Sequence, residues 1–140
     1  MTSVFIDTSA FLAILSSSDF NHEQARATWE ELLLSGAILV SSNYVLVETT
    51  ALVQRRLGME AVRAFHECVC PVLEIEWADR GMHDSAVAAL LVADRRNLSL
   101  VDCVSFAIMR RREMTRVFGF DTHFAEQGFL CVPELHIHDR

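Results

Sequence analysis

The sequence predicts an α/β fold in which a central parallel sheet is flanked by helices. Short apolar segments of strand length alternate with longer segments in which apolar residues recur at helical spacing. Two of the strand segments, residues 4–6 and 37–40, are apolar throughout, which is typical of strands covered on both faces. Strands that alternate with helices form right-handed crossovers and a parallel sheet. At 140 residues the chain fits one domain, which we expect to span residues 1–140.

In the first half of the chain, capping residues bound the predicted helices. Thr8 or Ser9 lies at the start of the first helix, and the polar residues 41–43 offer caps for the third. Gly36 and Gly58 end the second and third helices, because glycine easily adopts the conformation that follows a helix. The predicted elements are a strand over 4–6, a helix over 10–15, a helix from 19 or 21 to 35, a strand over 37–40 and a helix over 44–57.

The second half continues the alternation. Ser99 and Asp102 have the spacing of a capping box that opens a helix. The helix before it has an apolar surface over residues 86–93 that is too wide for one core-facing stripe, so it is either deeply buried or partly covered by another subunit. The predicted elements are helices over 60–67, 79–95 and 100–112, a helical turn over 121–127, strands over 72–76, 115–120 and 129–132, and a charged tail.

Composition excludes several classes of protein. The net charge of −7 argues against broad non-specific binding to a phosphate backbone. All 12 basic residues are arginines, which excludes a P-loop lysine, a Schiff-base lysine and the lysine of a receiver-type phosphorylation site. The longest apolar stretch, residues 86–93, is far shorter than the ~20 residues that span a bilayer. We therefore expect a cytoplasmic protein without membrane contact.

The four cysteines lack the spacing of a zinc or redox site. None is separated from the next by two residues, and in a reducing compartment such cysteines are small buried hydrophobes more often than ligands. The cysteines are Cys68, Cys70, Cys103 and Cys131.

Four acidic residues occupy equivalent places in the predicted topology. Asp7 and Asp121 each follow a predicted strand, and parallel strands bring residues at their carboxyl ends to one edge of the sheet. Glu48, within the third helix, and Asp102, in the first turn of the sixth, lie among apolar neighbours, with no arginine within one helical turn in sequence. A buried carboxylate is costly unless it is paired or binds a metal. Converging acids therefore suggest a hard cation such as Mg²⁺ or Mn²⁺.

Each acid also has a simpler interpretation, and taken singly these interpretations stay open. Asp7 is in position to cap the first helix, Asp102 belongs to the capping box and Asp121 is in position to cap the helical turn. Glu48 fits a solvated helical acid. Four such coincidences at equivalent places favour the metal site.

At these residues the chain resembles the PIN-domain ribonucleases, and among them the VapC-like toxins of toxin–antitoxin pairs. The resemblance implies a PIN-like three-layer fold, a metal site made by Asp7, Glu48, Asp102 and Asp121, and a hydrogen bond from Ser9 that supports Asp7. Family members often have a hydroxyl residue where this chain has Gly119, which puts the support of Asp121 in doubt. The matching segments are Val4-Phe5-Ile6-Asp7-Thr8-Ser9-Ala10, Glu48-Thr49, Leu98-Ser99-Leu100-Val101-Asp102-Cys103-Val104-Ser105-Phe106 and Phe118-Gly119-Phe120-Asp121-Thr122-His123-Phe124.

The activity implied by this resemblance is hydrolysis of RNA phosphodiester bonds with one or two Mg²⁺ or Mn²⁺ ions held by the four acids. It also implies a cognate antitoxin that covers the acidic site and a homodimer. For His123, two residues after Asp121, we expect a packing or capping role before a ligand role. The basic residues that end the sixth helix are either solvated charges that the helix dipole favours or contacts to RNA phosphates; they are Arg110, Arg111 and Arg112.

Three other functions are compatible with parts of the sequence. A phosphatase of the haloacid-dehalogenase type needs a second aspartate where this chain has Ser9, and it needs a lysine, so the sequence argues against it. A nuclease acting on DNA flaps is disfavoured because no insertion is long enough to thread a flap. A PIN-like module that binds RNA or protein without cleavage remains the main alternative.

Overall fold

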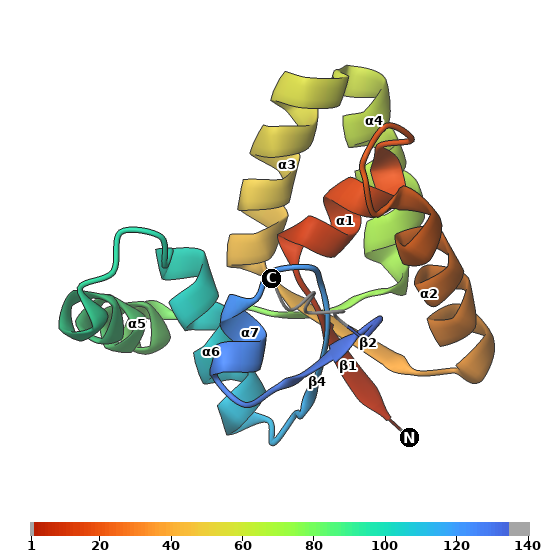
Figure 1. Cartoon of the computed structure of the whole chain (residues 1–140). Coiled ribbons are helices and arrows are strands. Elements are labelled where there is room, and N and C mark those ends of the chain that lie inside the picture. The colour runs from red at the N-terminus through yellow and green to blue at the C-terminus, as the bar shows by residue number, and fades with distance from the viewer. Residues whose placement is uncertain (1, 135–140) are drawn as a thin grey trace, which may run out of the picture.

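The computed structural model describes residues 2–134, in which five parallel strands form one sheet (Figure 1). The strand order is β3-β2-β1-β4-β5, so the sheet extends from β1 in both directions. The predicted parallel α/β sheet is confirmed. The strands are β1 (Ser3–Ile6), β2 (Ile38–Ser42), β3 (Glu74–Glu76), β4 (Arg116–Phe118) and β5 (Leu130–Val132).

Helices cover both faces of this sheet, which gives the three layers that the sequence predicts. In Figure 1, α1 and α2 lie on one side of the strands, whereas α6 lies on the other side with α5 outside it. The helices are α1 (Thr8–Leu15), α2 (His22–Ser35), α3 (Asn43–Leu57), α4 (Met59–Ala64), α5 (Arg80–Ala93), α6 (Leu100–Arg111) and α7 (His123–Glu126).

The central strand β1 is the most deeply buried part of the sheet. Val4, Phe5 and Ile6 have no exposed surface, which explains their unbroken apolar run. Phe5 is paired with Val40 of β2 on one side and with Val117 of β4 on the other. Because the strand order changes direction at β1, residues that follow β1 and β4 emerge next to each other at the carboxyl edge.

The predicted caps are confirmed at the second, third and sixth helices, whereas the first helix is capped by Asp7 and not by Thr8 or Ser9. The Ser42 side chain accepts a hydrogen bond from the Val45 amide at 3.1 Å and begins α3. Gly36 ends α2 with a φ of 70°, in the left-handed region that glycine adopts without strain. Ser99 and Asp102 form the expected capping box at the start of α6.

The segment between α4 and α5 differs from the prediction of a helix over 60–67 and a strand over 72–76. After α4 the chain continues as a π-helical turn (Phe65–Val69) and a 3₁₀ turn (Cys70–Val72). The side chains of Phe65 and Val69 are buried and anchor this continuation in the core. Pro71 is compatible with it because the first turn of a helix needs no backbone donor. The strand is consequently limited to β3.

Two further predictions concern exposure. The apolar surface of α5 is exposed and not deeply buried: Leu91 and Val92 are 72% and 87% exposed. The prediction of four buried cysteines is right only for Cys103; Cys68 is exposed, and the other two are partly exposed. None of the helices within residues 2–134 is long and apolar enough to cross a membrane. Residues 135–140 of the predicted charged tail lie outside the described part of the chain.

Candidate metal centre

Asp7 is the first residue after β1 and also the N-cap of α1. Its Oδ2 atom accepts hydrogen bonds from Ser9 Oγ at 2.7 Å and from the Ser9 amide at 3.3 Å. The expected support of Asp7 by Ser9 is therefore present as a contact. Asp7 is 4% exposed, and burial raises the pKa of its carboxyl group to about 7, although the bond from Ser9 lowers it and the charge of Asp102 raises it further.

Asp102 lies in the first turn of α6, and the capping box fixes its orientation. The Ser99 amide donates to Asp102 Oδ2 at 3.1 Å, and the Asp102 amide donates to Ser99 Oγ at 3.0 Å. Asp102 is buried. Burial raises the pKa of its carboxyl group, the Ser99 amide opposes this increase, and the charge of Asp121 adds to it. The capping role and a ligand role are thus compatible.

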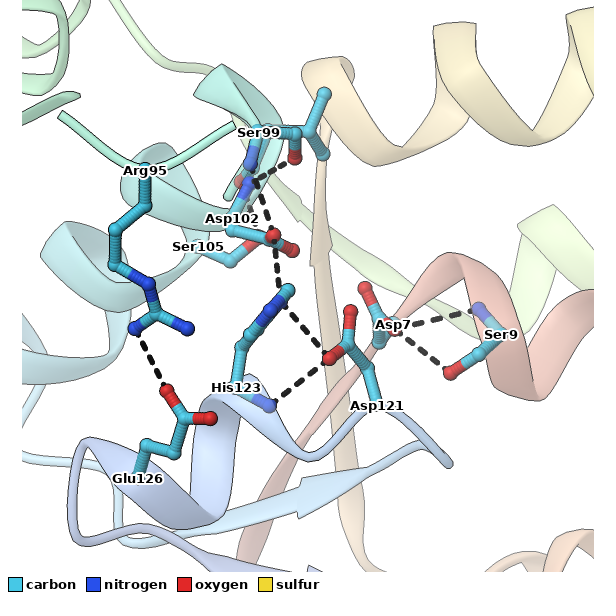
Figure 2. A network of polar contacts seen from close by, with 10 residues as sticks. Asp7, Ser9, Arg95, Ser99, Asp102, Ser105, Asp121, His123 and Glu126 are labelled. Atoms are coloured by element: carbon cyan, nitrogen blue, oxygen red, sulfur yellow. Dashed lines mark hydrogen bonds and ion pairs between the residues drawn. The ribbon is translucent and has the colours of Figure 1, made fainter. Parts of the chain in front are cut away.

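Asp121 follows β4 and faces Asp102 across His123 (Figure 2). The His123 amide donates to Asp121 Oδ1 at 2.9 Å. The His123 ring atom Nδ1 lies 3.0 Å from Asp121 Oδ1 and 3.2 Å from Asp102 Oδ2. One ligand atom from each of these three residues lies within 4.8 Å of the others. The sequence places His123 next to the site, two residues after Asp121, and predicts a packing or capping role for it; in the structure its ring lies between the two acids.

Glu48 reaches the same region from the middle of α3. It is partly buried, and burial is the main reason why the pKa of its carboxyl group is raised. A hydrogen bond from the Thr8 side chain lowers that pKa, whereas the charges of Asp102 and Asp121 raise it. The charges of Asp102 and Asp121 thus act on both Asp7 and Glu48. The group whose ligand atoms lie within 4.8 Å of one another contains Asp102, Asp121 and His123 and does not include Asp7 or Glu48.

The donor atoms of this cluster fit a divalent cation that prefers oxygen. Burial is the main cause of each raised pKa, and a bound divalent cation would offset the cost of burying these negative charges. The contacts described above involve one oxygen of each aspartate, Oδ2 of Asp7, Oδ2 of Asp102 and Oδ1 of Asp121. Among residues 2–134, no hydrogen bond or ion pair involves the second oxygen of any of these aspartates, and oxygen is the ligand that Mg²⁺ and Mn²⁺ prefer.

The three predicted arginines lie at the opposite end of α6 from Asp102. At 1.5 Å per residue this is roughly 12–15 Å along the helix axis. The Arg110 guanidinium lies 5.4 Å from the centre of the Phe129 ring. Arg112 forms ion pairs with Glu74 at 2.7 Å and with Glu76 at 3.8 Å. Within residues 2–134, Arg111 has no ion-pair partner.

The fold and this cluster define an α/β protein with a group of acidic side chains at the carboxyl edge of its sheet. Comparison with known families agrees with this class. A family model described as PIN domain matches residues 4–130. The chain therefore belongs to the PIN domain family.

One group of similar proteins matches this chain over nearly its whole length. The 23S rRNA-specific endonuclease VapC20 of Mycobacterium tuberculosis is 32% identical over 130 residues, which cover 92% of this chain and 97% of that protein. The crystal structure of VapC20, described as a Sarcin-Ricin loop cleaving toxin, superposes with a TM-score of 0.80 and 30% identity over 90% of this chain and 95% of that chain.

Two more distant structures share the fold alone. FitAcB from Neisseria gonorrhoeae has a TM-score of 0.67 at 15% identity and covers 96% of this chain and 99% of that chain. VapBC2 from Rickettsia felis, solved with a DNA fragment from its promoter, has a TM-score of 0.68 at 11% identity and covers 93% of this chain and 97% of that chain.

Proposed function

We propose that this chain is a divalent-metal-dependent endoribonuclease that hydrolyses RNA phosphodiester bonds and acts as the toxin of a toxin–antitoxin pair. The observation that carries this proposal is that Asp102 and Asp121 lie together at the carboxyl edge of the sheet and that their charges also act on Asp7 and Glu48. The similarity over nearly the whole chain to VapC20, an endonuclease specific for 23S rRNA, supports RNA as the substrate.

In this proposal Asp7, Glu48, Asp102 and Asp121 hold one or two Mg²⁺ or Mn²⁺ ions. Such an ion supplies positive charge that activates a water molecule and neutralises the charge that develops on the phosphate and the leaving oxygen. Ser9 and Ser99 hold the carboxylates of Asp7 and Asp102 in place before substrate arrives, so less reorganisation is needed during the reaction. The active centre uses no nucleophilic side chain.

The decisive experiment measures the degradation of mixed RNA in the presence of Mn²⁺. We expect the wild type to cleave RNA, and we expect Asp7→Asn and Asp102→Asn to reduce the rate at least a hundredfold. Asn can still accept the cap hydrogen bonds, so the fold is retained. Asp84→Asn removes an exposed acid from α5 and serves as the control with unchanged activity. Equal degradation by wild type and Asp7→Asn, or none by either, contradicts the proposal.

The alternative function is a PIN-like module that binds RNA or protein without cleaving it. Both functions need the same metal centre, so binding assays alone do not separate them. Wild-type protein that retains RNA of unchanged length in Mn²⁺ supports the alternative, whereas shortened RNA supports the nuclease.

We also propose a cognate antitoxin that covers the acidic site with a basic segment, and a cytoplasmic location where RNA is accessible. The net charge of −7 and the excess of acids at the site favour a basic partner. Co-expression with the product of a neighbouring reading frame that encodes a small DNA-binding protein tests this partner: we expect the two chains to co-purify and RNA cleavage to stop. Independent elution of the two chains excludes that partner.

A further inference from the structure

Gly119 lies directly after β4, where the chain passes the end of β1. Its backbone conformation does not require glycine, because its φ lies outside the positive range found at three other glycines of the described chain. The limited space around Gly119, however, does favour glycine. A Cβ atom at this position would lie 3.1 Å from Asp7 Cβ, 3.1 Å from Ser9 Oγ and 3.4 Å from Asp7 Oδ2. Any other residue therefore forces its neighbours to shift.

The backbone around Gly119 cannot easily relieve this crowding. It is held on both sides by the ends of the neighbouring strands and by the first turn of α1. The three hydrogen bonds that hold it are Asp7 N to Phe118 O at 2.9 Å, Gly119 N to Val132 O at 3.3 Å and Phe120 N to Ser9 Oγ at 2.9 Å. A new Cβ would consequently displace the side chains of Asp7 and Ser9 before it displaced the strand.

Ser9 Oγ is the atom on which this displacement would fall most directly. It accepts a hydrogen bond from the Phe120 amide and donates one to Asp7 Oδ2 at 2.7 Å. One hydroxyl group thus ties the carboxylate of Asp7 to the segment that leads to Asp121. The tie is possible because position 119 leaves the space beside the hydroxyl empty.

We propose that Gly119 is a positioning residue of the metal centre: it leaves room for Ser9 Oγ, and Ser9 Oγ orients Asp7 toward the metal ion. The inference rests on the proposed function, in which Asp7 is a metal ligand. Gly119 itself contacts neither metal nor substrate and acts through Ser9 and Asp7.

The test is the affinity for Mn²⁺, measured by calorimetry without RNA. We expect Gly119→Ala to weaken Mn²⁺ binding at least tenfold and Ser9→Ala to weaken it severalfold. In the double variant the added Cβ no longer meets the hydroxyl, so the loss should be clearly smaller than the product of the two single losses. Gly81→Ala is the matched control with unchanged affinity, since a Cβ there has no neighbour closer than 3.6 Å.

The outcomes separate this inference from the proposed function. Wild-type protein that binds no Mn²⁺ removes the metal site and this inference with it. Two results overturn the role of Gly119 alone while the wild type still binds Mn²⁺. One is a change of less than twofold in the Mn²⁺ affinity of Gly119→Ala, and the other is a double variant whose loss of affinity equals the product of the two single losses. If Gly119→Ala does not fold, the double variant with Ser9→Ala should fold with the circular dichroism of the wild type. A double variant that also fails to fold overturns the inference.

Discussion

Asp7 combines a structural and a chemical property in one carboxyl group. As N-cap of α1 it needs only an oxygen acceptor, but its burial makes the negative charge costly while no metal ion is bound. The pKa of about 7 expresses this cost, because an ordinary aspartate in an unfolded chain titrates near 3.8. The folded, metal-free protein therefore binds the Asp7 proton more tightly than the unfolded chain does.

This difference predicts how stability depends on pH. Because the pKa of Asp7 is higher in the folded protein than in the unfolded chain, its protonated carboxyl group contributes to the free energy of unfolding. This contribution is fully present below about pH 4 and is lost as the pH rises through about 7. Asp7→Asn keeps the cap without the charge, so in EDTA we expect it to melt a few degrees above the wild type at pH 8 and at nearly the same temperature at pH 4. Thermal melts across this range provide the measurement. A melting difference that stays constant with pH would contradict the buried charge.

Three of the four candidate acids have a local signal in the sequence, but the contacts that surround them do not. Strand ends and a capping box mark Asp7, Asp121 and Asp102 in the sequence because those signals are local. The ring of His123 between two acids depends on how the β4–α7 segment packs against α6. The crowding at Gly119 depends on a contact between segments that are 111 positions apart.

At the scale of elements, helices with capping residues could be predicted closely and the segment after α4 could not. Local capping residues mark helix ends directly, as Ser42, Gly36 and the Ser99 capping box do. The continuation through Cys70–Val72 is decided instead by the burial of Phe65 and Val69. Such tertiary contacts override the local signal of the alternating residues that follow Pro71.

The end of α6 allows a test of the proposed RNA contacts that distinguishes its arginines. Arg112 is already compensated by Glu74 and Glu76, whereas Arg111 has no ion pair within residues 2–134. If this end contacts RNA phosphates, Arg111→Gln should reduce the salt dependence of RNA binding. The slope of the logarithm of the binding constant against the logarithm of the salt concentration should fall by about one, and Arg112→Gln should change it less.

A variant that lacks all three charges tests their combined contribution to RNA binding; it carries Arg110→Gln, Arg111→Gln and Arg112→Gln. We expect weaker RNA binding at low salt together with unchanged Mn²⁺ affinity, because these arginines lie at the other end of α6 from Asp102. Unchanged RNA affinity and unchanged salt dependence in the triple variant would show that the charges are solvated and serve only the helix end.

At the scale of the whole molecule, the exposed apolar surface of α5 predicts the homodimer that the sequence also suggests. Leu91 and Val92 are neighbours in the sequence and largely exposed, so together they offer an apolar surface that a second copy of the chain can cover. Light scattering at micromolar concentration should give twice the chain mass of 15.8 kDa. Leu91→Glu combined with Val92→Glu should reduce the mass to that of one chain. Leu34→Glu, at an 89% exposed position on α2, is the control that should remain dimeric. A monomeric wild type rules the dimer out.

The position of β4 beside β1 has a consequence for the protein during its synthesis. Until the ribosome has added residues 116–118, β1 has a partner on one side only, and the amide of Asp7 lacks its acceptor at Phe118. A growing chain that has already released Asp7, Glu48 and Asp102 therefore still lacks both the strand that orders them and the fourth acid. The fold thus delays assembly of the acidic cluster until β4 and Asp121 have been synthesised.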